Sequence, residues 1–330
     1  MLEPEIAAFV AAVDAWYPAD AAARSPDEQR RLYDRFAAEW TPAALPAGIV
    51  QQDAVWHAPD GRAIALRRYT AAHGTPRGTV LFFHGGGFVV GSLDSHALIT
   101  AQLAADTGLD VIAVDYRLAP EHRAPAALDD CLAVTRAARD ARWPFGPCAH
   151  PLTLAGDSAG GMLAAAVATA LRDAGEGGID GIALVYPMLG FEPQSPARET
   201  EAHAPMLTLD DVHRYRALYW DGQLDGQLDG QLNGTLSDAQ LDGNPLLRAS
   251  VPLAASRFDG LPPVLAIGAE HDPLRDDARV YVERIRAAGG AAHYWMGEGL
   301  VHGCWRALGT SPQAARMHRT IGGFLLAPHA

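Results

Sequence analysis

The sequence predicts an α/β protein in which one mostly parallel β-sheet has helices packed on both of its faces. Three observations predict this fold class. Short apolar runs recur along the chain, each too apolar to have a face in water. Ala-rich helical segments such as 126–139 and 159–172 lie between these runs, and such alternation builds a parallel sheet covered on both faces. The 330 residues, 49% of them hydrophobic, suffice for a single large core, so we expect one domain. The apolar runs are residues 80–83, 111–114, 152–154, 182–185 and 264–267.

The first 45 residues are expected to form two helices that cover the core as a lid or cap. Apolar side chains recur in both at three- and four-residue spacing, which places them on one helix face. A capping box announces the second helix, with Ser25 as N-cap, Pro26 at the first helical position and Glu28 three residues after the cap. The recurring apolar residues are Ile6, Phe9, Val10, Val13 and Trp16, and then Leu32, Phe36 and Trp40.

An antiparallel hairpin is expected between these helices and the alternating part of the chain. A strand from residue 49 to 56 and an alternating segment from 64 to 68 flank an Asp60-Gly61 turn. Beyond the hairpin, ligands of a parallel α/β sheet bind at the carboxyl ends of its strands. We therefore look for functional residues directly after each apolar run.

The stretch from about 190 to 246 breaks the strand–helix rhythm and contains an Asp-Gly-Gln-Leu repeat at 221–232. Its leucines have helical spacing, but each glycine would cost a helix interior about 1 kcal/mol, so we expect a surface loop. The alternative is a calcium site with Asp221, Asp225 and Asp229 as ligands, although their spacing matches no EF-hand loop. We favour the loop and expect no metal.

Charge and cysteine content restrict the partners and the compartment. The chain carries 26 basic and 39 acidic residues, a formal net charge of −13, and such a chain repels nucleic acid and anionic bilayers. Three cysteines make no disulfide framework and fit a reducing compartment. No signal-peptide pattern opens the sequence, and about 18 consecutive apolar residues, enough to span a bilayer, occur nowhere. We expect a cytoplasmic protein without nucleic-acid or membrane partners, and a homodimer is compatible with the sequence.

The most specific motif is Gly156-Asp157-Ser158-Ala159-Gly160, between an apolar strand and an Ala-rich helix. A nucleophilic serine must be lifted from the backbone by a sharp strand-to-helix turn, which requires small residues two before and two after it. Glycine occupies both positions, and the helix N-terminus favours negative charge beside Ser158. Ser158 is the candidate nucleophile, and the bland alternative is a glycine-rich turn.

A second motif, His84-Gly85-Gly86-Gly87, follows the strand that ends at Phe83. The tetrahedral intermediate of ester hydrolysis needs preorganised donors for its oxyanion, and backbone N–H groups serve where no side chain blocks the approach. We predict an oxyanion hole made by the N–H groups of Gly85, Gly86 and Ala159. The alternative is a flexible turn.

The orienting acid is expected at Asp272, just past the strand at 264–267 and just before a helix beginning at Pro273. This placement faces the same edge of the sheet as the candidate serine, and in this arrangement the acid follows the nucleophile along the chain. Asp276 and Asp277 would lie on the helix itself, where we expect solvated or capping charges.

The base is expected at His302, on a glycine-flanked loop after a last short strand at 292–296. His293 lies within that strand and His318 within the final helix, so both are interpreted as structural. His84 precedes the acid in the chain and is interpreted as a hydrogen-bonding wall residue.

These motifs, together with Tyr-Arg-Leu-Ala-Pro-Glu-His at 116–122 and the segment 269–277, resemble the bacterial branch of the hormone-sensitive-lipase family of esterases. The similarity runs from about Val80 to the C-terminus. It implies an eight-stranded α/β-hydrolase core in a single domain, with a helical cap built from about residues 1–45 and about 188–246.

The resemblance also assigns Ser158, Asp272 and His302 as the catalytic triad and repeats the oxyanion-hole assignment above. It implies short- to medium-chain acyl esters as small-molecule substrates, hydrolysed with neither metal nor organic cofactor. Cys304 stands near the base where the family commonly has a bulky aromatic residue, and it is expected to alter the pocket or to make activity sensitive to oxidation.

We therefore expect a serine carboxylesterase that works through an acyl-enzyme. Acyl transfer, or lactone or amide hydrolysis, on the same machinery is the alternative within enzymes. A ligand-binding protein without catalysis is the alternative outside them, and the complete triad disfavours it.

Overall fold

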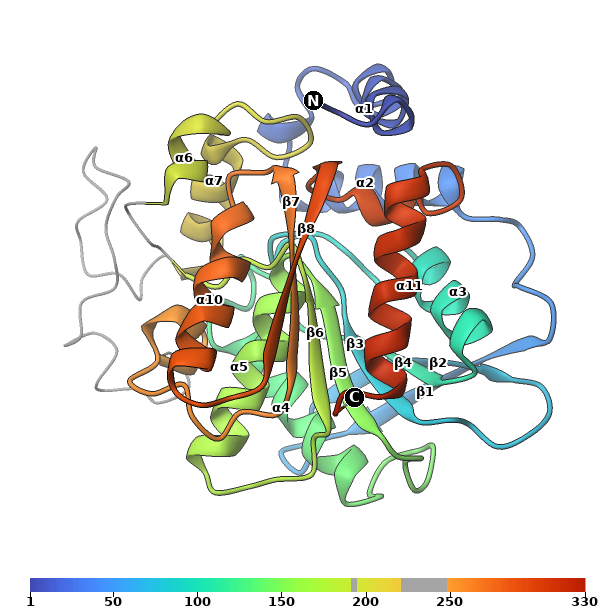
Figure 1. Cartoon of the computed structure of the whole chain (residues 1–330). Helices are drawn as coiled ribbons and strands as arrows, with labels where there is room; N and C mark the ends of the chain where they lie inside the picture. The colour runs from blue at the N-terminus through green and yellow to red at the C-terminus, as the bar shows by residue number, and fades with distance from the viewer. Residues whose placement is uncertain (191–194, 221–247, 330) are drawn as a thin grey trace.

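The computed structural model describes residues 1–190, 195–220 and 248–329, and these ranges contain one eight-stranded sheet (Figure 1). The strand order is β1-β2-β4-β3-β5-β6-β7-β8. β1 and β2 form the predicted hairpin and pair antiparallel, and β2 is also antiparallel to β4, whereas β4 through β8 run parallel. The mostly parallel eight-stranded sheet is therefore confirmed. The strands are β1 Ile49–His57, β2 Ala63–Ala71, β3 Thr79–Phe83, β4 Asp110–Asp115, β5 Leu152–Asp157, β6 Gly181–Val185, β7 Val264–His271 and β8 Ala292–Val301.

Helices cover both faces of the sheet, as the alternating sequence predicts. In Figure 1, α3 (Ala97–Thr107) and α11 (Pro312–Leu326) lie on one face. The opposite face carries α4 (Ala126–Arg139), α5 (Ala159–Asp173) and α10 (Arg275–Ala287). The bounds of α4 and α5 agree with the predicted helical segments to within one residue.

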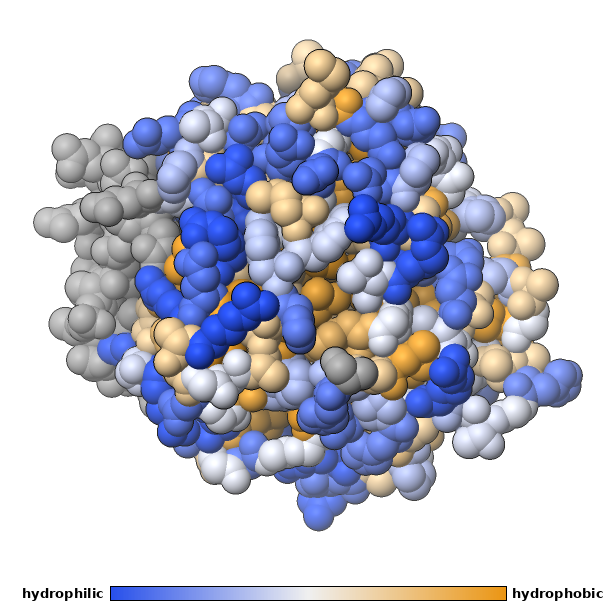
Figure 2. Space-filling view, viewed as in Figure 1, coloured by the Kyte–Doolittle hydropathy of each residue, from blue (hydrophilic) through white to orange (hydrophobic). Residues whose placement is uncertain are grey.

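The core consists of two hydrophobic layers separated by the sheet. Successive strand residues point to opposite faces, so Leu81 and Phe83 pack toward α4 and α5 while Val80 and Phe82 pack toward α3 and α11. All five residues of β3 are buried, which explains why its sequence has no polar alternation. The face seen in Figure 2 is mostly hydrophilic, with apolar side chains showing near its centre and in smaller groups at its top and right.

Four helices gather beyond the carboxyl ends of the parallel strands (Figure 1). They are α1 (Pro4–Trp16), α2 (Pro26–Trp40), α6 (Pro196–Thr200) and α7 (Leu209–Trp220). The predicted capping box opens α2, because the Ser25 hydroxyl accepts from the Glu28 N–H and the Glu28 carboxylate accepts from the Ser25 N–H. These helices belong to the segments predicted as a cap.

Part of the predicted cap, residues 191–194 and 221–246, lies outside the described residues, and so do the Asp-Gly-Gln-Leu repeat and the calcium alternative at Asp221, Asp225 and Asp229. No helix in the described ranges has both the length and the apolar composition of a bilayer span. The part of the chain that the structure describes also contains three 3-10 turns, at Ala21–Ala23, Pro252–Ala254 and Cys304–Ala307.

Candidate active site

Ser158 stands at the turn between β5 and α5, with its backbone in a left-handed conformation (φ 53°) that non-glycine residues rarely adopt. The turn is held by the Ser158 N–H, which donates to the carbonyl of Val185 on β6 over 2.8 Å. A Cβ at Gly156 would collide with the Gly160 backbone, and one at Gly160 would collide with the Phe83 carbonyl. The two glycines are therefore required by contact with neighbouring backbone, as the motif predicts.

The three predicted triad residues meet in one hydrogen-bonded chain. The Ser158 Oγ lies 2.8 Å from His302 Nε2, and His302 Nδ1 lies 2.7 Å from Asp272 Oδ2. The other oxygen of Asp272, Oδ1, accepts from the Leu274 N–H over 2.8 Å. Asp272 is fully buried and His302 is 9% exposed, while Ser158 is partly exposed. The imidazole is thus oriented by a dry carboxylate and faces a hydroxyl that substrate can reach.

Two neighbouring strands position the acid and the base. β7 ends at His271 and β8 at Val301, so Asp272 and His302 each follow directly on a strand. The strands pair parallel, with His271 opposite Val301, and this register brings the two side chains together. β8 extends to Val301, beyond the predicted segment 292–296, and His302 lies in the turn directly after it, beside Gly303, as predicted.

The oxyanion-hole prediction is wrong at Gly85. Its N–H already donates to Asp157 Oδ1 over 2.9 Å, and a side chain there would collide with the same carboxylate. Gly86, Gly87 and Ala159 line the cavity in front of Ser158. The N–H groups of Gly86 and Gly87 donate to no acceptor in the described part of the chain. The candidate donors are therefore Gly86, Gly87 and Ala159.

A buried cluster of ionisable side chains adjoins this site and forms part of the cavity lining. His96 Nε2 lies 3.3 Å from Asp157 Oδ1, and Arg306, 6% exposed, has its guanidinium 5.0 Å from the Tyr33 ring centre. Burial alone would raise the pKa of the Asp157 carboxyl, but His96 and Arg306 hold that pKa below its ordinary value. Asp157 is therefore an anion, fit to accept the Gly85 N–H. The sequence signal for this contact is an acidic residue directly before the nucleophile.

His84 is a buried hydrogen-bonding residue, but it does not line the cavity as the predicted wall residue would. Its ring stacks on Tyr116 with centroids 4.3 Å apart, and its Nδ1 lies 2.8 Å from the Gly85 carbonyl oxygen. Burial, together with the neighbouring His96, lowers the pKa of His84 to about 3, so the ring is neutral. Its contact with the Gly85 carbonyl fixes the position of Gly85, the first glycine of the motif.

His293, His318 and Cys304 do not line the cavity. His293 is exposed on β8, and His318 accepts from Trp305 and contacts Asp106, which makes it structural. The Cys304 thiol is fully buried and does not line the cavity, and burial raises its pKa well above the ordinary range. The expected effects of Cys304 on pocket shape and oxidation are not supported, because neither substrate nor oxidant reaches it.

Asp276 and Asp277 lie in the first turn of α10, as predicted, but they are buried, so the expectation that they are solvated is wrong. Asp277 is 1% exposed; it accepts from the Leu189 N–H over 3.0 Å and from the Arg198 guanidinium over 2.8 Å. Asp276 accepts from the Ser195 hydroxyl and the Ala197 N–H, both over 2.9 Å. Both carboxylates fasten the segment that carries α6 to the first turn of α10.

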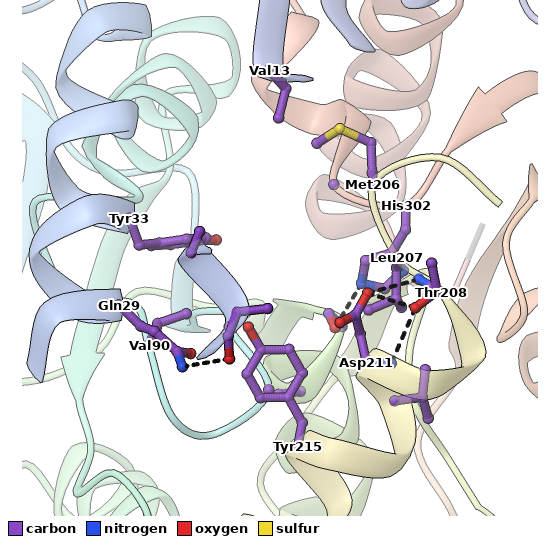
Figure 3. Close-up of a pocket in the computed structure, with 18 of the residues that line it drawn as sticks. Val13, Gln29, Tyr33, Val90, Met206, Leu207, Thr208, Asp211, Tyr215 and His302 are labelled. Carbon is purple, nitrogen blue, oxygen red and sulfur yellow. Dashed lines mark hydrogen bonds between the residues drawn. The ribbon is translucent and has the colours of Figure 1, made fainter. Parts of the chain in front are cut away.

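The catalytic chain opens into a cavity of about 400 Å³. Figure 3 shows Tyr33 and Tyr215 on one side, and Leu207 and Thr208 with His302 on the other. The walls come from α1, α2, α7 and the two catalytic turns. In the described residues, no group of three His, Cys, Asp or Glu side chains could hold a metal ion. The mostly apolar side chains near Ser158 include Leu32, Phe36, Val90, Met188, Met206, Leu207, Val212 and Leu274.

Comparison with known proteins is consistent with this geometry. The family described as having the α/β hydrolase fold matches residues 80–306. Esterase LipI of Mycobacterium tuberculosis is 35% identical over 235 residues, which are 71% of this chain and 68% of LipI. Carboxylic ester hydrolase LipN of the same organism is 34% identical over 73% of this chain and 60% of its own length. An ethyl acetate hydrolase of Pseudomonas putida is 29% identical over 91% of both chains.

Solved structures extend the similarity over the whole chain. Ester-hydrolase EH1AB1 from the Lake Arreo metagenome, in complex with a bipyridine phosphonate derivative, matches with a TM-score of 0.84 at 30% identity over 99% of both chains. The esterase of Pyrobaculum calidifontis matches with a TM-score of 0.81 at 26% identity over 99% of this chain and 98% of its own. This chain therefore belongs to the α/β-hydrolase fold family, in the hormone-sensitive-lipase branch of bacterial esterases.

Proposed function

We propose that this protein hydrolyses short- to medium-chain carboxylic esters through an acyl-enzyme on Ser158. It is a serine hydrolase of the carboxylesterase class. The observation that carries the proposal is the unbroken hydrogen-bonded chain from Asp272 through His302 to Ser158, which ends in a cavity. That chain supplies the nucleophile, the base and the orienting acid that acyl transfer requires.

The reaction begins when Ser158 Oγ attacks the ester carbonyl carbon and its proton passes to His302 Nε2. Asp272 stabilises the resulting imidazolium through Nδ1–H. The N–H groups of Gly86, Gly87 and Ala159 receive the oxyanion, a role for which donors fixed before the reaction are effective. Collapse of the intermediate expels the alcohol, which takes the proton from Nε2, and water then releases the acid by the same steps in reverse order.

The cavity supports the proposed substrate size. About 400 Å³ lies between the catalytic turns and helices α1, α2 and α7, which we propose act as the cap. Binding sites for small molecules are mostly apolar with a few polar groups, as this one is.

The three cysteines are free thiols, which supports a reducing compartment such as the cytoplasm.

Ser158→Ala tests the function. In a series of p-nitrophenyl esters from acetate to dodecanoate, the parent is expected to prefer the short and medium chains and to release a burst of p-nitrophenol equal to the enzyme concentration. The variant should lose about a millionfold in kcat. A variant that kept near-parental turnover would contradict the proposal, and a parent with neither burst nor turnover would favour a binding protein instead. Ser311→Ala, which removes a hydroxyl that caps α11, is the matched control and is expected to keep its kcat.

A further inference from the structure

The glycine turn that supplies the proposed oxyanion donors has an unusual backbone conformation. We define residues 86–92 as the oxyanion loop. Gly86, Gly87 and Phe88 have successive φ values of 121°, 60° and 63°, all in the left-handed half of conformational space. Phe88 is not a glycine, and such a conformation persists only where surrounding structure imposes it. The question is which part of the molecule does so.

One answer is Tyr215 on α7. A Cβ added at Gly87 would fall on three carbon atoms of the Tyr215 ring, so the ring lies directly against the Gly87 backbone. Figure 3 shows Tyr215 rising from α7 beside the cavity. This contact excludes every side chain larger than hydrogen at position 87. It also prevents the Gly87 peptide from moving toward α7.

The next turn of α7 holds the next residue of the oxyanion loop. The Phe88 ring is fully buried and stacks on Tyr219, with centroids 3.9 Å apart and an interplanar angle of 11°. Trp220 meets the same ring edge-on at 5.6 Å. Aromatic pairs of this kind contribute beyond the area that they bury. Tyr215 and Tyr219 are four residues apart and therefore share one face of α7.

The rest of the oxyanion loop is held by α2. The Arg30 guanidinium donates from Nε to the Val89 carbonyl over 2.8 Å, and the Ser92 hydroxyl donates to Asp34 over 2.7 Å. Within the loop, Val89 and Val90 donate to the Gly86 carbonyl. Gly86 and Gly87 line the cavity, and their N–H groups have no acceptor among the described residues. The loop thus lies between two helices of the proposed cap.

We propose that α7 is a working part of the oxyanion hole, with Tyr215 and Tyr219 as positioning residues that keep the N–H groups of Gly86 and Gly87 directed at the substrate carbonyl. This inference rests on the proposed function. It assigns to α7 an effect on the rate of the chemical step, beyond forming a wall of the pocket. Removing either ring should lower kcat while substrate affinity changes little.

Tyr215→Ala and Tyr219→Ala test the inference. Misplacing one donor should lower kcat by up to about a hundredfold, and KM should stay within about threefold. Tyr215→Phe, which keeps the ring, should recover most of the lost kcat. The decisive readout is the ratio of kcat/KM for p-nitrophenyl butyrate to that for its thionoester. Sulfur accepts hydrogen bonds weakly, so a displaced donor harms the oxygen ester more and the ratio should fall.

Phe145→Ala is the matched control. It removes a partly buried ring that packs on Trp143 at 5.3 Å, in the segment before β5 and hence at the opposite edge of the sheet. It should lower the melting temperature without changing kcat or the thionoester ratio. Circular dichroism identifies folded variants. If Tyr215→Ala does not fold, the inference is tested with Tyr219→Ala and with Tyr215→Leu instead.

Unchanged kcat and an unchanged thionoester ratio in a folded Tyr215→Ala or Tyr219→Ala protein would overturn the inference. So would a loss that resides in KM alone. If Ser158→Ala is inactive while the tyrosine variants behave as the parent, only this inference fails. If Ser158→Ala is active, the proposed function fails with it.

Discussion

Replacing Asp272 by asparagine should nearly abolish catalysis without disturbing the fold. In the parent, Asp272 Oδ1 accepts from the Leu274 N–H and Oδ2 accepts from His302 Nδ1–H. An asparagine has only one acceptor, and the backbone N–H of Leu274 can be satisfied only by the amide oxygen. The amide NH₂ must then face His302 Nδ1 at the 2.7 Å position.

This arrangement forces the wrong tautomer. A donor opposite Nδ1 requires a lone pair there, so the imidazole proton moves to Nε2, which faces Ser158 Oγ at 2.8 Å. His302 then donates to the serine and cannot take its proton. The expected loss in kcat is about ten-thousandfold, or about 5.5 kcal/mol in the activation free energy.

The assay is steady-state hydrolysis of p-nitrophenyl butyrate at saturating substrate, with thermal unfolding to verify the fold. Asp106→Asn is a control of the same chemistry, because Asp106 contacts His318 Nε2 at 3.1 Å away from the site. It should keep parental kcat. An Asp272→Asn protein that retained more than about a tenth of the parental kcat would refute the tautomer argument.

Three further variants or treatments probe the supporting structure. Arg198→Met leaves the Asp277 carboxylate buried without its cation and should lower the free energy of unfolding by about 3–5 kcal/mol in urea titrations. Burial raises the pKa of Asp277, and a carboxyl whose folded pKa is raised loses stability as pH increases, so the deficit should be larger at pH 8 than at pH 5. Asp157→Ala leaves the buried Gly85 N–H without an acceptor and should lower kcat about tenfold. Asp157→Asn should restore most of the lost kcat, because its amide oxygen can accept from the same N–H. With Cys148 replaced by serine, the two remaining thiols, Cys131 and Cys304, are fully buried and should react with Ellman's reagent only after unfolding.

Each of these has a contrary outcome. Equal stability of the Arg198 variant and its parent would show that the buried pair contributes little. A pH-independent deficit would contradict the proposed protonation behaviour. Parental kcat in Asp157→Ala would remove that carboxylate from the support of the oxyanion loop, and rapid modification of either buried thiol in native protein would mean that its surroundings open.

The sequence predicts the triad because each member is fixed by local chain geometry. Ser158 needs a turn that only small neighbours allow, and Asp272 and His302 each come just after a strand. Strand ends of a parallel sheet share one edge, so adjacency follows from the topology alone. Three positions therefore suffice to locate the centre of the site.

The sequence does not predict which side chains from distant segments contact one another. Which glycine N–H is free depends on the Asp157 carboxylate taking that of Gly85. The sequence of α10 suggests that Asp276 and Asp277 are solvated, because Arg198, which pairs with Asp277, comes from a separate segment. The contact between Tyr215 and Gly87 likewise joins residues with no common pattern. Such pairings depend on the final packing and leave no periodic signal.

The two hydrogen bonds of the triad differ greatly in the length of chain that they close. The acid–base pair spans 30 residues, across a single strand–helix–strand unit, whereas the bond to the serine spans 144. For a flexible chain, closing the longer loop costs about 1.4 kcal/mol more conformational entropy. The imidazole and its carboxylate can thus meet within one supersecondary unit, while the hydroxyl joins them only after distant strands have assembled. The recovery of enzymatic turnover during refolding would then measure the rate of this late assembly step. The NMR signal of the His302 ring would report the earlier formation of its hydrogen bond with Asp272.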